Sequence, residues 1–205
     1  MLEVADLECV RGDRQLFTAM SFSVQPRELL HVHGPNGSGK TSLLRLVCGL
    51  TLPANGEIRW RGTPIRELAE EYFVDVLYLG HLNGLKDELS GQENLRINCA
   101  LAGADTMPEA VTAVLDRIGL AGYEDLPVKV LSQGQKRRVA LARLLLSKAT
   151  LWILDEPFTA LDSAAVNVLQ GILAAHLNNG GMVILTTHQE FALDAQQIKR
   201  IHLGT

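Results

Sequence analysis

Residues 34–41 read Gly34-Pro-Asn-Gly-Ser-Gly-Lys-Thr41 and match the pattern G-x-x-x-x-G-K-[ST]. A compact apolar run, Leu29–His33, precedes it and predicts a buried strand, and Ser42–Leu50 follows with the pattern of a helix. Glycines let a backbone wrap closely around phosphate, and the start of a helix offers its positive dipole end. The stretch therefore predicts a site for the phosphates of a nucleotide.

Every residue of this loop is a candidate for contact with ATP. The candidates are Gly34, Pro35, Asn36, Gly37, Ser38, Gly39, Lys40 and Thr41. The Lys40 ammonium can reach the β- and γ-phosphates, so we expect it to serve catalysis as well as binding. The Thr41 hydroxyl can bind Mg²⁺. A glycine-rich turn without a ligand is disfavoured, because the lysine, the threonine and the strand–loop–helix setting are all in place.

A second signal is the apolar run Leu151–Leu154, which ends in Asp155 and Glu156. The carboxyl end of a buried strand faces the ligand crevice of an open α/β sheet. We expect Asp155 to hold Mg²⁺, directly or through water, and Glu156 to orient or deprotonate the attacking water. Taken alone, two solvated acids before a turn at Pro157 would explain the pair equally well. Beside the phosphate loop, the pair predicts hydrolysis of ATP.

Strand-like and helix-like segments alternate through most of the chain, which predicts an α/β fold with a largely parallel sheet. The remaining expected strands are Leu2–Cys9, Leu16–Val24, Gly56–Trp60, Val74–Leu79, Met182–Thr186 and Ile198–Leu203. The first two form an N-terminal antiparallel part. A further helix is expected at Ser163–Leu177.

The middle of the chain is mainly helical. Capping-box spacing marks helix starts at Ser90, Thr106 and Ser132. The expected helices run to about Ala102, over Ala110–Ile118 and to about Leu146. We therefore predict a single domain. Its α/β core takes in about 1–85 and 147–205, and a helical subdomain is inserted at about 86–146.

Composition narrows the classes of partner. The 205 residues are 47% hydrophobic and 20% charged with a formal net charge of −4, so the chain is globular and nucleic acid is not expected as a partner. Three cysteines without a CxxC pair indicate reduced thiols rather than a disulfide or zinc scaffold. No apolar run reaches the ~18–20 residues that span a bilayer. If the protein serves a membrane, we expect it to act from outside the lipid.

The segment Leu131-Ser-Gln-Gly-Gln135 lies between the phosphate loop and the acid pair. With these three motifs in this order, the chain resembles the ABC ATPase family, whose signature is written LSGGQ; here Gln133 replaces the first glycine. The resemblance implies that Ser132, Gly134 and Gln135 contact the γ-phosphate of ATP bound to a second protomer. Two active sites would then form only in a homodimer. A simple capping box is the plainer alternative for this segment alone.

Further positions match or depart from the family. Ala160-Leu161-Asp162 looks like the family's D-loop, which crosses the dimer interface, and Thr186-Thr187-His188 looks like its switch histidine. The resemblance implies that His188 is catalytic and contacts the γ-phosphate. His81 stands where the family usually has a glutamine, and Arg11 where an aromatic residue stacks on adenine. Both are candidates for nucleotide contact, since histidine can bond water or Mg²⁺ and a guanidinium can stack on a base.

Within the family, Gly80–Leu95 and Phe158–Asp162 are similar to the haem exporter ATPase of cytochrome c maturation. That resemblance implies integral membrane transporter subunits as partners and a peripheral place on the cytoplasmic face of the inner membrane. It implies haem export or release of a haem-loaded chaperone, and the sequence does not choose between them. No CxxCH motif is present, and the four histidines left over read as ordinary polar or core residues, so direct haem contact is not expected. These are His31, His33, His176 and His202.

Two questions stay open at this level. Leu82, Leu85 and Leu89 are expected either to line a groove for a helix of a membrane subunit or to pack within the helical subdomain. An ABC ATPase for another substrate, or a soluble nucleotide-switch module, remains the alternative function.

Overall fold

The computed structural model describes residues 1–104, 106–189, 191, 193 and 198–204. The chain forms two compact units. The core unit consists of Met1–Tyr78, Ala149–Glu156 and Ala174–Thr205, and the helical unit consists of Leu79–Lys148 and Pro157–Leu173. The predicted α/β fold class is confirmed, whereas the predicted division at about 86–146 stays a prediction.

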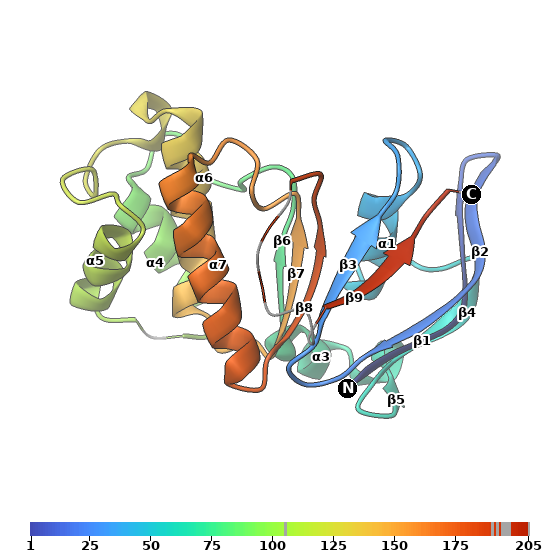
Figure 1. Ribbon diagram of the computed structural model, residues 1–205. Coiled ribbons are helices and arrows are strands. Elements are labelled where there is room, and N and C mark those ends of the chain that lie inside the picture. Colours follow the sequence, from blue (N-terminus) through green and yellow to red (C-terminus); the bar gives the residue numbers. More distant parts are fainter. Residues whose placement is uncertain (105, 190, 192, 194–197, 205) are drawn as a thin grey trace. The chain divides into compact units, whose positions relative to one another are not determined.

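The core unit contains a five-stranded sheet in the order β6-β7-β8-β3-β9 (Figure 1). Its strands are β3 (Leu29–His33), β6 (Val76–Leu79), β7 (Leu151–Asp155), β8 (Met182–Thr186) and β9 (Ile198–His202). β3 pairs in parallel with both β8 and β9, and β7 pairs in parallel with β8. Every residue of β7 and β8 is buried, which explains their unbroken apolar runs. The carboxyl ends of β3, β7 and β8 therefore meet at one edge, where the phosphate loop and the acid pair begin.

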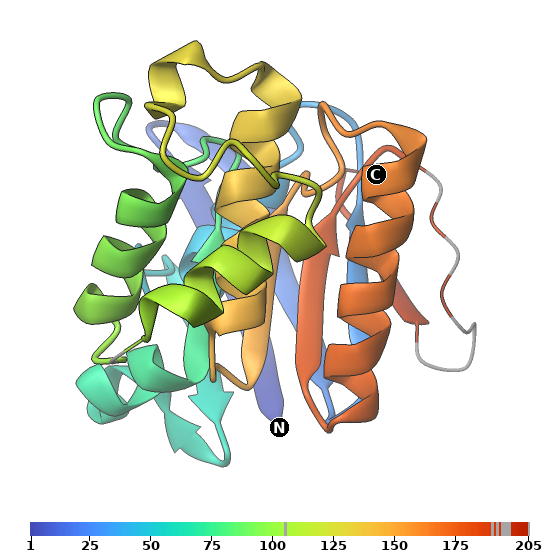
Figure 2. The same ribbon diagram turned by 90° about the vertical axis from the view of Figure 1, so that its left-hand side faces the viewer.

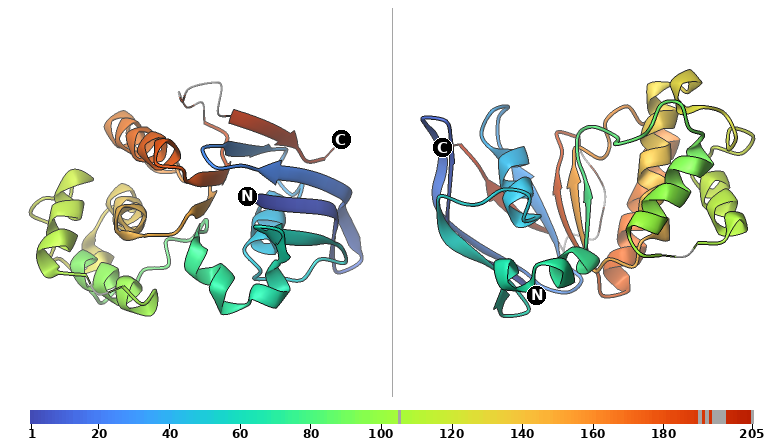
Figure 3. Two further views of the ribbon diagram at one scale, coloured as in Figure 1. Left: turned by 90° about the horizontal axis from the view of Figure 1, so that it is seen from below. Right: turned by 180° about the vertical axis from the view of Figure 1, so that it is seen from behind.

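A second, antiparallel sheet completes the core unit in the order β2-β1-β4-β5. Its strands are β1 (Leu2–Arg11), β2 (Arg14–Val24), β4 (Asn55–Trp60) and β5 (Thr63–Pro64). Helix α1 (Lys40–Val47) lies between the two sheets (Figure 3). It buries Leu43, Leu44, Leu46 and Val47 in the same apolar cluster as residues of both sheets. Burial on two sides fixes this short helix, and with it the loop that precedes it.

One expected strand is shorter than predicted. The strand predicted at Val74–Leu79 begins at Val76, because Val74 and Asp75 end helix α3 (Glu70–Asp75). Two acids in the first turn favour that helix, and the hydroxyl of its buried Tyr72 donates to the Val47 carbonyl at 2.7 Å. Helix α2 (Ile65–Leu68), which precedes it, was also not expected.

The helical unit contains α4 (Gly91–Leu101), α5 (Pro108–Arg117), the short 3₁₀ helix η1 (Val128–Val130) and α6 (Gln133–Leu146) (Figure 2). Helix α7 (Ser163–Asn178) begins in this unit and ends in the core unit. Both sides of the capping box form at Ser90 and at Ser132, as predicted. The cap predicted at Thr106 is wrong. Met107 is the N-cap without a side-chain bond, because Pro108 opens the helix and holds the residue before it in an extended conformation.

All three cysteines, Cys9, Cys48 and Cys99, are buried thiols. Burial raises the pKa of Cys9 and of Cys48, so both stay protonated at neutral pH. Within the described part of the chain, no helix is both long and apolar enough to cross a membrane.

Candidate nucleotide site

The loop after β3 can be built only with glycine at its first position. Gly34 has φ +148°, and a Cβ there would lie 2.5 Å from the Leu203 carbonyl oxygen and 2.6 Å from Ser38 Oγ. Gly39 has φ +101°, and a Cβ there would lie 3.3 Å from the ring of Phe17. The loop is thus packed closely between Leu203, which directly follows β9, and Phe17 of β2.

Lys40 closes over the loop. Its Nζ donates to the carbonyl oxygens of Gly34 at 2.7 Å and of Pro35 at 3.2 Å, and it lies 3.4 Å from His188 Nε2. Gly39 is the N-cap of α1 and has no side chain that can cap it, so the first N–H groups of the helix stay open to an anion. The ammonium and the helix start both favour a phosphate group here.

The acid at the end of β7 is held by two hydroxyls. Thr41 Oγ1 donates to Asp155 Oδ2 at 2.7 Å, and Thr186 Oγ1 donates to Asp155 Oδ1 at 2.6 Å. Asp155 is only 2% exposed. Mg²⁺ prefers oxygen ligands and is commonly bound through one or two carboxylates together with substrate phosphates. The Thr41 hydroxyl and the Asp155 carboxylate fit such an ion, and both face the start of α1.

Glu156 follows in a backbone conformation that is uncommon for a side-chain-bearing residue. Its φ is +50°, and its N–H donates to Thr186 through both the carbonyl oxygen, at 3.1 Å, and the hydroxyl, at 3.0 Å. Glu156 Oε1 lies 3.6 Å from His188 Nε2. Strained backbone held by neighbouring structure is typical of active sites. Lys40, Glu156 and His188 thus lie close together in the core unit, and their catalytic roles stay predictions.

His31 contributes a contact that the sequence did not predict. Its Nε2 lies 3.2 Å from the carbonyl oxygen of Thr187, the residue before His188. Burial, together with the nearby His33, Arg200 and His188, lowers the pKa of His31 to about 4, so the imidazole is neutral at neutral pH. A neutral ring donates one N–H, which Thr187 can accept. Together with Thr186, which sits at the end of β8, His31 holds the backbone that carries His188.

The signature-like segment lies in the helical unit. Ser132 Oγ accepts from the N–H of Gln135 at 3.2 Å, and Gln135 Oε1 accepts from the N–H of Ser132 at 2.9 Å. A Cβ at Gly134 would lie 2.9 Å from the carbonyl oxygen of Ala160, so a side chain there would press on the segment that looks like a D-loop. Ser132 is exposed and Gly134 half-buried. An exposed helix start of this kind can receive an anion from another molecule.

Two predicted nucleotide contacts are exposed. Arg11 ends β1 in the core unit, whereas Phe17, its nearest aromatic residue in sequence, is buried against Gly39. His81 is exposed and belongs to the helical unit, like Ser132 and its neighbours. The roles of these residues toward ATP stay predictions.

A comparison with protein families finds a match over residues 17–159 to the family described as ABC transporter. The chain belongs to this family. A cytochrome c biogenesis ATP-binding export protein, CcmA, of Nitrosomonas europaea is 58% identical over 204 residues, which is 100% of this chain and 96% of that protein. A protein of the same name from Vibrio vulnificus is 47% identical, with 100% of both chains covered.

Solved structures agree with this assignment. An ATP-binding protein assigned to the ABC transporters of Pyrococcus furiosus has a TM-score of 0.84 and 26% identity, covering 98% of this chain and 96% of that one. The predicted ABC-type ATPase is thus confirmed, and so is the resemblance to the cytochrome c group within the family.

Proposed function

We propose that this chain is the ATP-hydrolysing subunit of an export system for cytochrome c biogenesis and that it works as one half of a homodimer. The relatives are named ATP-binding export proteins of cytochrome c biogenesis, and their matches cover 100% of this chain. The work done is haem export or release of a haem-loaded chaperone. Haem itself does not contact this chain, whose histidines at 31, 33 and 176 are engaged in core contacts.

The observation that carries the proposal is the Thr41–Asp155 hydrogen bond beside Lys40 and the open start of α1. ATP places its β- and γ-phosphates in the loop Gly34–Thr41, where backbone N–H groups and the Lys40 ammonium receive their charge. Thr41 and Asp155 would hold Mg²⁺, which would supply positive charge beside the phosphate oxygens. On binding, Lys40 exchanges the carbonyl oxygens of Gly34 and Pro35 for phosphate oxygens.

Hydrolysis needs a water aligned with the γ-phosphate. Glu156 accepts a proton from that water or orients it, and the backbone bonds to Thr186 hold Glu156 in place. His188, which lies near both Lys40 Nζ and Glu156 Oε1, contacts the γ-phosphate. His81, which replaces the usual glutamine of the family, is proposed to contact the nucleotide with its polar side chain.

The second protomer completes the site. The exposed, serine-capped start of its α6 presents Ser132, Gly134 and Gln135 to the γ-phosphate. Closure of the two copies around ATP excludes bulk water and retains the one attacking water, and hydrolysis separates the copies again.

Integral membrane subunits are the proposed partners, which places the protein on the cytoplasmic face of the inner membrane. Leu82 is 83% exposed, so it does not pack within the helical unit, whereas Leu85 and Leu89 are half-buried. An exposed leucine beside two partly covered ones suits the apolar face of a helix from a membrane subunit.

Co-purification tests the proposal. The tagged chain is expressed with and without the membrane subunits of the cytochrome c biogenesis system, and its membrane fraction is measured. We expect membrane association only when those subunits are present, and weaker association for Leu82→Ser. Equal recovery in the soluble fraction under both conditions would instead support a soluble nucleotide switch. Co-purification with unrelated membrane subunits would support an ABC ATPase for another substrate.

A further inference from the structure

Arg137 is a buried cation that the reaction described above does not use. It lies in the second turn of α6, shortly after the Ser132 cap, and only 3% of it is exposed. Burying a guanidinium is costly unless its N–H groups are hydrogen-bonded. An arginine in this position must therefore be hydrogen-bonded to its surroundings, and those hydrogen bonds also restrict the groups that accept them.

The hydrogen bonds of the Arg137 guanidinium offset the cost of its burial. Nε donates to the carbonyl oxygen of Pro157 at 3.3 Å, and Nη1 donates to the carbonyl oxygen of Gly80 at 3.3 Å and to Asn83 Oδ1 at 3.0 Å. All four residues belong to the helical unit. One side chain thus joins three segments that are far apart in the sequence.

Two of these hydrogen-bond partners are sequence neighbours of residues with proposed roles in ATP hydrolysis. Pro157 directly follows Glu156, the proposed base, and Gly80 directly precedes His81. A carbonyl oxygen fixed by a charged donor restricts the peptide next to it. Arg137 therefore restrains the Gly80–His81 peptide and the Pro157–Phe158 peptide, one residue beyond Glu156. It does so from the helix that begins with the signature-like segment.

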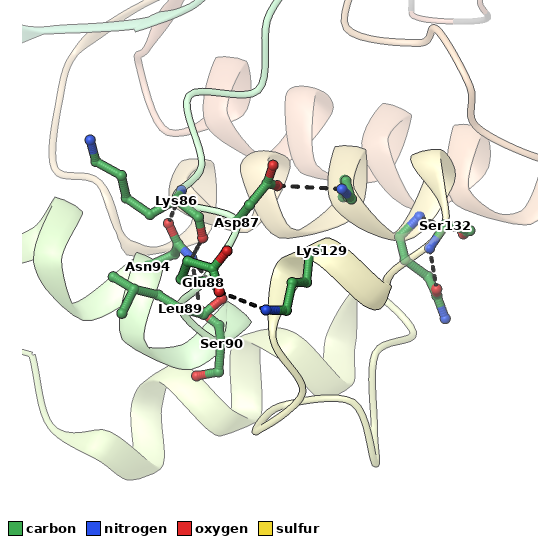
Figure 4. A network of polar contacts seen from close by, with 10 residues as sticks. Lys86, Asp87, Glu88, Leu89, Ser90, Asn94, Lys129 and Ser132 are labelled. Carbon is green, nitrogen blue, oxygen red and sulfur yellow. Dashed lines mark hydrogen bonds and ion pairs between the residues drawn. The ribbon is translucent and has the colours of Figure 1, made fainter.

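The far end of the loop 80–89 is fastened to the same region (Figure 4). Asp87 Oδ1 lies 3.4 Å from Lys136 Nζ, its carbonyl oxygen accepts from the N–H of Lys129 at 2.9 Å, and Glu88 Oε2 lies 2.6 Å from Lys129 Nζ. These ion pairs are partly exposed, so each contributes little by itself. The loop 80–89 is therefore attached at both ends: the exposed ion pairs hold its end, and the buried Arg137 holds its start.

We propose that Arg137 is a positioning residue for ATP hydrolysis. Its hydrogen bonds hold the loop 80–89, which contains His81, and the turn at Pro157 against α6 near its start. The proposal rests on the proposed roles of Glu156 and His81. It assigns Arg137 no contact with ATP. Loss of Arg137 should therefore slow the chemical step while the phosphate loop, which is built by other residues, still binds ATP.

The test compares steady-state ATP hydrolysis, ATP affinity and thermal unfolding for the full chain and its variants. In Arg137→Gln we expect kcat to fall about 10–100-fold, as for a small misplacement of catalytic groups, with the KM for ATP within about threefold of wild type. Arg137→Lys, which keeps the charge but not the fork of donors, should recover part of kcat. Arg143→Gln removes a partly buried guanidinium further along α6 and should leave kcat unchanged.

Asn83→Ala provides a milder variant in case Arg137→Gln does not fold. It should lower kcat in the wild-type background and have a smaller effect in the Arg137→Lys background, because the two residues share one contact. Wild-type kcat in Arg137→Gln or in Asn83→Ala would overturn the proposal, and so would a fall of ATP affinity in step with thermal stability. Glu156→Gln is measured in parallel: if it keeps full turnover, the proposed base is wrong, whatever Arg137 does.

Discussion

The Thr41 hydroxyl donates to the Asp155 carboxylate at 2.7 Å, although 114 residues separate them in the sequence. This bond joins the first turn of α1 to the end of β7. It means that the two predicted Mg²⁺ ligands are already within reach of one ion. Preorganised ligands lose little conformational entropy on binding.

Removing that hydroxyl should weaken the metal site selectively. Thr41→Val keeps the shape of the side chain but removes the oxygen ligand. We expect the Mg²⁺ midpoint of ATP hydrolysis to rise by about 10–100-fold, the range typical for altered metal-site residues. Thr41→Ser retains the hydroxyl and should behave like wild type. An unchanged Mg²⁺ midpoint in Thr41→Val would exclude Thr41 as a ligand.

Glu156 and Lys40 should fail in opposite ways. Glu156→Gln removes the proposed base and should lower turnover about 10²–10⁴-fold while ATP still binds. Lys40→Ala removes the ammonium over the phosphate loop and should abolish ATP binding itself. Equilibrium binding of labelled ATP, measured beside phosphate release, separates the two defects. Near-normal turnover in Glu156→Gln would remove the assigned role.

Ser90 and Ser132 form a matched pair of helix caps, since both have the complete capping box. Replacing either by alanine should cost about 0.5–2 kcal/mol of stability. Only Ser132→Ala should also impair ATP-dependent dimerisation, because only that cap is proposed to meet the partner's γ-phosphate. Size-exclusion chromatography with ATP in the Glu156→Gln background measures this. Equal dimerisation of the two serine variants would count against the clasped homodimer.

Gly34 and Gly37 should tolerate a methyl group differently. Alanine at Gly34 places its Cβ 2.5 Å from the Leu203 carbonyl oxygen, whereas at Gly37 there is open space within 4 Å. Both have positive φ, so each substitution carries backbone strain of about 1–3 kcal/mol, and Gly34→Ala adds the clash. We expect the lower free energy of unfolding for Gly34→Ala in urea titrations. Similar values for both would show that the loop relaxes away from β9.

His31 should make stability depend on pH. Its pKa is about 4 in the folded chain, compared with about 6.5 for an unperturbed histidine. Between these values the unfolded chain binds more protons, so the free energy of unfolding is complete above about pH 6.5 and falls as the pH drops toward 4. His31→Gln should reduce that slope. Urea titrations at several pH values check this, and identical slopes would show that the pH dependence comes from other groups.

The local motifs could be predicted from the sequence because their chemistry is contained in a few adjacent residues. The loop Gly34–Thr41 and the caps at Ser90 and Ser132 are of this kind. The end of helix α3 was missed because Val74 is β-branched and lies next to the apolar run Val76–Leu79, so it looks like the start of that strand. The cap at Thr106 failed because Pro108 overrides the side-chain signal.

Contacts between distant segments could not be predicted in the same way. His31 looks like an ordinary core histidine until β8 brings the Thr187 carbonyl beside it. Arg137 looks like one member of a basic run, Lys136-Arg-Arg138, until the loops at Gly80 and Pro157 close around it. Their partners are set by tertiary packing, which a residue pattern does not encode.

The buried state of all three native thiols has a practical consequence. A thiol-specific spin label or fluorophore added to the native chain has no exposed cysteine on which to react. A single new cysteine on the surface, at Leu82 or near Ser132, would then carry the whole signal. The opening and closing of two copies could thus be followed as a distance between identical labels, without first removing a native residue.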